Sequence, residues 1–138
     1  MFRNRRFASL IVLAASMTLC FTSIWAQDTR GKPAPTIIPV NMDGKDYVRL
    51  LGGPPDSINM RSGAVMLQPG KTVGKHNTGA YEELIIVLEG QVAMILSDGK
   101  LLEIKLGTAL YCPPDTEHDV KNLGAGPLRY IYVVAKTR

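Results

Sequence analysis

From Val40 onward, short apolar runs alternate with polar turn residues along the chain. No long stretch places apolar residues at the helical period, so the pattern does not favour helices. Apolar runs of four to eight residues bounded by Gly, Pro and Asp are typical of β-strands. We therefore predict an all-β domain. The expected strands are residues 47–51, 63–68, 83–88, 91–96, 100–104, 109–112, 118–121 and 128–135.

The sharpest turn signal is the dipeptide Asp98-Gly99, which lies between two of these runs. A two-residue type I′ turn needs positive φ at both central positions, and Asp-Gly tolerates that conformation. The sequence predicts such a turn here, with residues 100–104 folding back on residues 91–96 as a β-hairpin.

Two of the expected strands contain apolar runs without strict alternation, at residues 84–88 and 130–134. Strands of this kind are usually covered on both faces. An arm, a second sheet or another subunit would supply the outer cover, and a second copy of the chain is the most economical of these, so we expect a homodimer. About eight short strands are typical of a jelly roll or compact barrel, with an immunoglobulin-like sandwich as the alternative.

The first 26 residues do not resemble part of a folded domain. Arg3, Arg5 and Arg6 precede an apolar segment, and Trp25-Ala26 before Gln27 suits a signal peptidase. We expect a signal peptide at residues 1–26, an extended Pro-rich arm at 27–39 and a single domain at 40–138. The mature protein would be periplasmic or secreted, by the general export route or by a twin-arginine route.

Charge and cysteine content narrow the function classes. The formal net charge is +4, but three of these charges are leader arginines, so the remainder is close to neutral. It carries no basic patch interleaved with aromatics, which excludes nucleic acid as an expected partner. We also expect no membrane association after leader cleavage. Cys20 lies in the leader in a poor lipobox context, and Cys112 alone cannot form an intrachain disulfide.

The chain has two histidines, one between two expected strands and one at the start of another. His76 and Glu83 come from one strand-loop-strand region, and His118 begins a strand about forty positions later. Two histidines and one carboxylate form the ligand set of non-haem iron sites and also accept manganese, nickel, cobalt or zinc. The alternative is that each histidine is hydrogen-bonded at a strand end and binds no metal.

The two histidine regions follow two spaced motifs. The first has Gly70, His76, Thr78, Glu83 and Gly90, and the second has Gly107, Pro113, Asp115, His118 and Asn122. In this spacing and order the motifs resemble those of the cupins, with two departures. Thr78 stands where the family has a second histidine, and Asp115 stands where it has a glycine.

The resemblance to cupins implies a double-stranded β-helix barrel of jelly-roll topology, usually dimeric, with a metal in the barrel mouth. It places His76, Glu83 and His118 at metal-ligand positions, with Thr78 at the fourth. A threonine hydroxyl is a poorer ligand than imidazole for a divalent transition metal such as iron, manganese, nickel or zinc. A metal-free site with Thr78 hydrogen-bonded to a neighbour is the alternative.

Other polar side chains lie close to these motifs. Period-two alternation turns Glu117 and Asp119 outward if His118 points inward. We expect Asp115 to serve a turn, and Cys112 to be a small buried hydrophobe rather than a redox thiol. The remaining side chains that could reach the barrel mouth or an interface are Tyr81, Glu82, Tyr130 and Tyr132.

Two function classes follow. One is a small metal-dependent dioxygenase, isomerase or lyase acting on a small polar or sugar-derived molecule, because three ligands leave coordination positions open. The other is a non-enzymatic, metal-free module that binds a small molecule or carbohydrate in the barrel mouth. The sequence contains no nucleophile-base pair or phosphate-binding glycine motif that would indicate a third class.

Overall fold

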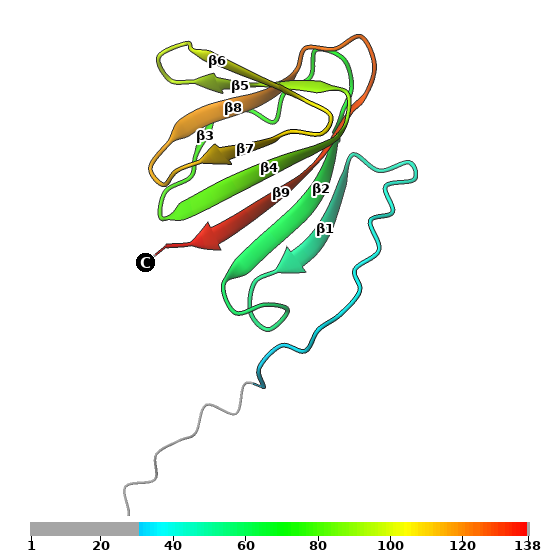
Figure 1. Cartoon of the computed structure of the whole chain (residues 1–138), viewed down its shortest axis with the longest axis vertical. Coiled ribbons are helices and arrows are strands. Elements are labelled where there is room, and N and C mark those ends of the chain that lie inside the picture. Colours follow the sequence, from blue (N-terminus) through cyan, green and yellow to red (C-terminus); the bar gives the residue numbers. More distant parts are fainter. Residues whose placement is uncertain (1–30, 138) are drawn as a thin grey trace, which may run out of the picture.

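Two antiparallel sheets face each other in the computed structural model, which describes residues 31–137 (Figure 1). The strands are β1 (Tyr47–Gly52), β2 (Met60–Leu67), β3 (His76–Asn77), β4 (Tyr81–Glu89), β5 (Gln91–Leu96), β6 (Leu101–Lys105), β7 (Ala109–Cys112), β8 (Glu117–Asn122) and β9 (Leu128–Lys136). That range contains no helix, and hence none that is long and apolar enough to span a membrane. The all-β prediction is confirmed.

The chain crosses repeatedly between the two sheets. One sheet has the order β1-β2-β9-β4-β7 and the other has the order β3-β8-β5-β6. Strands β7, β8 and β9 follow each other in sequence but alternate between the sheets, so neither sheet is built from one continuous segment. This is the jelly-roll arrangement expected from the motifs, and the immunoglobulin-like alternative does not apply.

The Asp98-Gly99 hairpin is present, but its turn differs from the prediction. Strand β5 pairs with β6, as expected. However, Asp98 does not have a positive φ, whereas Gly99 has φ +82°. The amide of Gly99 donates to the carbonyl of Leu96, and the amide of Leu96 donates to the carbonyl of Lys100. The connection is thus a three-residue loop with glycine in the left-handed position, and the two-residue type I′ turn was wrong.

Alternation along β4 separates the inside of the barrel from its outer surface. Ile85 and Val87 are buried between the sheets, whereas Leu84 and Ile86 are each 37% exposed on the outer face. The inner residues belong to one apolar cluster contributed by both sheets. Its buried members are Val65, Ile85, Val87, Val92, Met94, Leu110, Cys112, Val120, Leu128 and Tyr130. This cluster makes this part of the barrel interior a packed core.

Strand β3 was not predicted, because two residues cannot carry a recognisable alternation. It forms by pairing with β8, so that His76 lies opposite His118. Residues 31–46 contain no strand or helix, although Met42 is buried. The expected signal peptide at residues 1–26 and the first four residues of the expected arm lie outside the described residues.

Candidate metal centre

The three residues named from the motifs come together between the two sheets. His76 on β3 and His118 on β8 belong to the four-stranded sheet, and Glu83 on β4 belongs to the five-stranded sheet. One potential ligand atom from each of the three lies within 4.8 Å of the others. The two imidazole rings are direct cross-strand neighbours, with centroids 4.3 Å apart. This cluster can accept a divalent ion between its donor atoms.

Backbone carbonyls fix the tautomer of both histidines. Nδ1 of His76 lies 2.8 Å from the carbonyl oxygen of Gly74, and Nδ1 of His118 lies 3.2 Å from that of Thr116. A carbonyl oxygen only accepts, so each Nδ1 must carry the proton and donate it. In the neutral form of each ring, Nε2 then keeps its lone pair. Metal-binding histidines usually have their second ring nitrogen held in this way.

His118 is buried completely, and its Nε2 atom has no hydrogen-bond partner among the described residues. Glu83 Oε2 is 3.2 Å from that nitrogen, which is ion-pair distance, but it does not satisfy hydrogen-bond geometry. A buried polar atom without a partner is costly unless something binds it. The donor set and this unpartnered nitrogen therefore fit a metal ion.

The electrostatic surroundings of His118 favour a positive charge. Burial acts to lower the pKa of His118, but the Glu83 carboxylate and the Thr116 carbonyl outweigh it, so the net pKa is raised. The raised pKa means that the neighbouring groups stabilise a cation at this ring. A metal cation coordinated there would experience the same attraction to Glu83.

Thr78 lines the cavity beside these ligands, but its hydroxyl already has two partners. Its Oγ1 donates to the carbonyl of Pro113 and accepts from the amide of Thr116, both at 2.9 Å. A hydroxyl oxygen has one further lone pair. The assignment of Thr78 to the fourth ligand position thus stays a prediction, while its observed contacts hold the turn that leads into β8.

The acids around His118 point away from the centre, as expected. Glu117 forms an ion pair with Lys75 at 3.2 Å, and Asp119 accepts a hydrogen bond from Thr72. Asp115 has φ +55°, a left-handed conformation that glycine adopts readily and that aspartate tolerates. Its turn role is confirmed.

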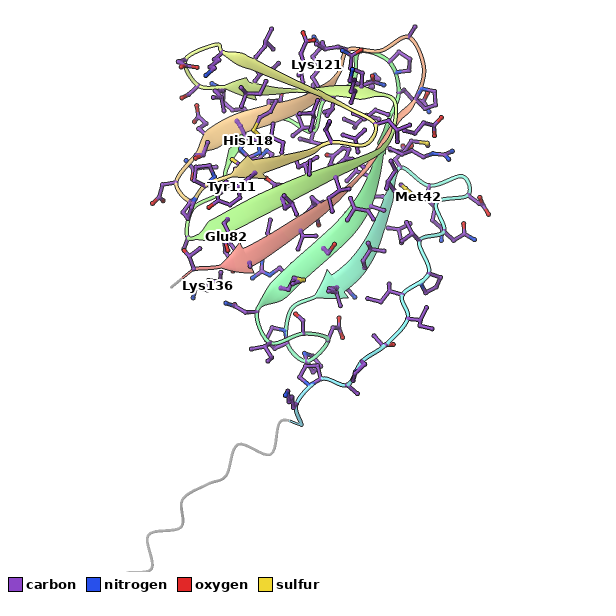
Figure 2. The ribbon with its side chains drawn as sticks, in the orientation of Figure 1. Met42, Glu82, Tyr111, His118, Lys121 and Lys136 are labelled. Atoms are coloured by element: carbon purple, nitrogen blue, oxygen red, sulfur yellow. The ribbon has the colours of Figure 1, made fainter. Side chains whose placement is uncertain are left out.

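The structure also shows where Cys112 and Glu82 lie. Cys112 is buried, and burial, with the charge of Glu83, raises the pKa of its thiol. It is a packed hydrophobe next to His118, with Sγ 3.6 Å from Nδ1. Glu82 lies on the outer face, where its carboxylate accepts a hydrogen bond from Tyr111 on the neighbouring strand (Figure 2).

A cavity of about 480 Å³ opens beside the cluster. Its size suits a small organic molecule. Its apolar wall comes from four valines, Val65, Val73, Val120 and Val134. Its polar surface comes from the ligand cluster and from several tyrosines. Those tyrosines are Tyr47, Tyr81, Tyr130 and Tyr132.

Gly63 makes room for part of this wall. A Cβ atom at Gly63 would lie 2.7 Å from Tyr47 Cε2 and 2.8 Å from Tyr132 Cε1. The two rings stack with centroids 6.5 Å apart, and their hydroxyls are 3.0 Å apart. Tyr130 lies on the same face, and burial together with the charge of Glu83 raises its pKa, so it is a neutral phenol. The sequence left Tyr130 and Tyr132 between a pocket and an interface, and both line the cavity.

Sequence reasoning missed Arg61, which also lines the cavity. Strand pairing places it in one row with Glu83, because Arg61 pairs with Val134 and Val134 pairs with Glu83. The alternation of β2 could have suggested that Arg61, Gly63 and Val65 share a face. No local signal indicates which distant strands lie beside them.

Comparison with known proteins assigns the family. A family model described as a cupin domain matches residues 63–134, slightly more than half of the chain. The matched segment contains both motifs and all three clustered residues. This chain belongs to the cupin family, and the resemblance inferred from its motifs is confirmed.

Solved structures support the double-stranded β-helix fold. BH2720 of Bacillus halodurans has a TM-score of 0.64 at 19% identity, covering 77% of this chain and 84% of that chain. An RmlC-like cupin family protein of Methanocaldococcus jannaschii has a TM-score of 0.61 at 21% identity, covering 74% and 91%. A predicted oxalate decarboxylase of Thermotoga maritima has a TM-score of 0.60 at 24% identity, covering 65% and 78%. At these identities the likeness concerns the fold alone.

One curated relative matches in sequence. The uncharacterized protein MJ1618 of Methanocaldococcus jannaschii is 40% identical over 57 residues. The aligned part covers 41% of this chain and 43% of the relative, so the chain spans less than half of that protein's length.

Proposed function

We propose that this cupin binds a divalent transition metal through His76, Glu83 and His118 and binds a small organic molecule in the adjoining cavity. The observation that carries the proposal is the state of the two imidazoles. Each donates its Nδ1 proton to a backbone carbonyl, and the buried Nε2 of His118 lacks a hydrogen-bond partner. This is the arrangement expected of histidines whose remaining nitrogen coordinates a metal.

His76, Glu83 and His118 would hold the metal and leave it open coordination positions, so that it would supply polarisation of a substrate oxygen or activation of a small molecule. The chain's own residues perform the other tasks. Gly74 and Thr116 orient the imidazoles through their carbonyls, and the Glu83 carboxylate offsets positive charge. The valines and tyrosines of the cavity exclude water from one side of a bound molecule.

The proposal favours a small metal-dependent enzyme of the dioxygenase, isomerase or lyase type. An open coordination site beside a cavity of about 480 Å³ is the feature that supports this class. A metal-free binding module is the alternative, and it requires that His118 Nε2 be satisfied by Glu83 or by a ligand. We further propose that the protein is exported and acts as a homodimer.

Metal content tests the proposal. Protein prepared without a metal-chelating tag would be analysed for bound metal and for the shift in melting temperature with iron, manganese, nickel and zinc. We expect near-stoichiometric metal in the parent. Glu83→Gln and His118→Ala should weaken metal binding by at least about 100-fold, since loss of even an outer partner of a ligand costs 10- to 100-fold.

Glu82→Gln is the matched control, because Glu82 is the next residue on β4 and faces the outside. It should retain the parent's metal content. A parent that holds no metal, and whose melting temperature does not respond to any of the four ions, would contradict the proposal and leave the metal-free binding module.

A further inference from the structure

The cavity has a second charged end that the metal site does not use. Within residues 31–137, Arg61 is the only lysine or arginine that lines it. In the row Arg61, Val134 and Glu83, two strand spacings separate the cation from the carboxylate, which is about 10 Å between Cα atoms. The row therefore carries a positive group at one end, an apolar residue in the middle and the ligand carboxylate at the other end.

The guanidinium of Arg61 is positioned by Tyr81. Its Nη2 donates to Tyr81 Oη at 2.7 Å, and its Cζ lies 5.0 Å from the centroid of the Tyr81 ring. This bond joins β2 to β4 across β9, because β9 lies between them in the sheet. Since Tyr81 Oη accepts from Arg61, its own hydroxyl proton is available to another acceptor.

Arg61 is exposed, and most of its donor capacity is not taken up by other protein groups. Arginine has five N–H donors, and within residues 31–137 only Tyr81 Oη accepts one from this side chain. None of the carboxylates in that range lies within ion-pair distance of it. Arg129, by contrast, forms an ion pair with Glu89 at 3.4 Å. Arg61 and Tyr81 thus offer several donors to an oxygen ligand at the cavity wall.

We infer that Arg61 and Tyr81 bind the carboxylate of a small monocarboxylic acid whose apolar or aromatic body lies against the valines and tyrosines of the cavity. A guanidinium forms paired hydrogen bonds with a carboxylate, and the Tyr81 hydroxyl adds a third donor. A singly charged group suits the site, because one arginine faces it and Glu83 lies in the same row. The inference names the ligand class for the proposed function and rests on it only in taking this cavity as the ligand site.

Benzoate is a suitable probe, with benzamide as its neutral counterpart of nearly the same shape. Binding to the full chain would be measured by titration calorimetry and ligand-detected NMR, with and without added zinc. We expect benzoate to bind more tightly than benzamide. Arg61→Met should weaken benzoate binding by about 10- to 100-fold, as expected for hydrogen bonds to a charged group, and should leave benzamide binding nearly unchanged.

Two variants separate the role of Arg61 from general effects of charge and folding. Arg129→Met removes the same charge from the ion pair with Glu89, and it should leave benzoate binding unchanged. Arg61→Lys keeps the charge but loses the paired N–H donors of the planar guanidinium, so it should bind benzoate with intermediate affinity. Circular dichroism and the melting temperature of each variant would verify that it folds.

The result that would overturn the inference is benzoate binding that is absent in the parent or equal in the parent and in folded Arg61→Met. Its failure is distinguishable from failure of the metal proposal. Metal bound stoichiometrically without Arg61-dependent benzoate binding refutes this inference alone. Arg61-dependent benzoate binding to a chain that takes up no metal supports this inference and refutes the metal site.

Discussion

The hydroxyl of Thr78 donates a hydrogen bond to the carbonyl oxygen of Pro113, 2.9 Å away. Thr78 Oγ1 also accepts a hydrogen bond from the amide of Thr116, so one side chain ties the end of β3 to the turn before β8. Thr78→Val keeps the shape but removes both bonds. We expect it to lower the free energy of unfolding by about 2 kcal/mol, measured by urea denaturation in the presence of a chelator. Thr78→Ser should lose much less, and equal losses in the two variants would show that these bonds contribute little.

A second prediction at this position concerns metal affinity. Thr78→His supplies a third imidazole, and so a fourth ligand, at the position where the cupin motif has a histidine, but it also removes the two bonds to the turn. We therefore expect slower loss of metal to a chelator together with a lower melting temperature of the metal-free protein. Chelator-competition kinetics and thermal unfolding would measure the two effects. Metal loss as fast as in the parent would show that the side chain at position 78 does not reach the ion.

Gly63→Ala tests the tyrosine pair on the cavity wall. The new Cβ would lie under 3 Å from both rings, so Tyr47 and Tyr132 would have to move. Overpacking of this kind costs about 1–3 kcal/mol, which denaturant unfolding would detect. Gly126→Ala is the control, because a Cβ there meets nothing within 4 Å. If the two variants were equally stable, the rings would have been free to shift.

We expect the outer face of the five-stranded sheet to form the contact surface of the homodimer. Leu84, Ile86 and Leu88 alternate along β4 on this face and are 37%, 37% and 42% exposed. Ile86→Asp would place a charge within a buried dimer contact, so we expect it to shift the protein to monomer in light scattering at micromolar concentration. Leu106→Asp, which changes a 63% exposed leucine between β6 and β7, should leave the dimer intact. A monomeric parent would contradict the prediction.

Export predicts a defined N-terminus. Cleavage after Ala26 would leave a protein beginning at Gln27, whose terminal glutamine can cyclise. Intact-mass measurement of protein from the cell envelope or medium should give that mass, with or without the loss of ammonia. A full-length species confined to the cytosol would refute the prediction.

Much of the fold could be predicted from the sequence, because inward and outward residues differ in polarity along the longer strands. Residues 91–96 and 109–112 have the predicted bounds as β5 and β7. The other six predicted strands lengthen or shift at their ends. Strand β3 could not be predicted, since only its partner β8 defines it. The Asp98-Gly99 turn was misjudged because the same dipeptide also fits the three-residue hairpin, with only its glycine left-handed.

The candidate site, like the fold, could be predicted from the sequence only in part. The ligand cluster could be located because His76, Glu83 and His118 stand at fixed spacings from glycines that the fold requires. Gly90 is one such residue, since a Cβ there would lie 2.7 Å from the carbonyl oxygen of Pro127. The contribution of Arg61 could not be foreseen, because it depends on the cross-strand register of three strands that are distant in sequence.

Strand β3 makes the three ligands unequal in how firmly they are anchored. Glu83 and His118 lie within longer strands that each pair with two neighbours, whereas His76 belongs to a two-residue strand at a sheet edge, and Gly74 and Gly79 with positive φ lie on either side of it. A short exposed element of this kind opens locally at a small fraction of the global unfolding free energy. Amide hydrogen exchange at His76 should therefore outpace that at His118. Glu83 and His118 are thus the firmly anchored part of the candidate centre, and local opening of β3 would give an ion a route in or out while the barrel stays folded.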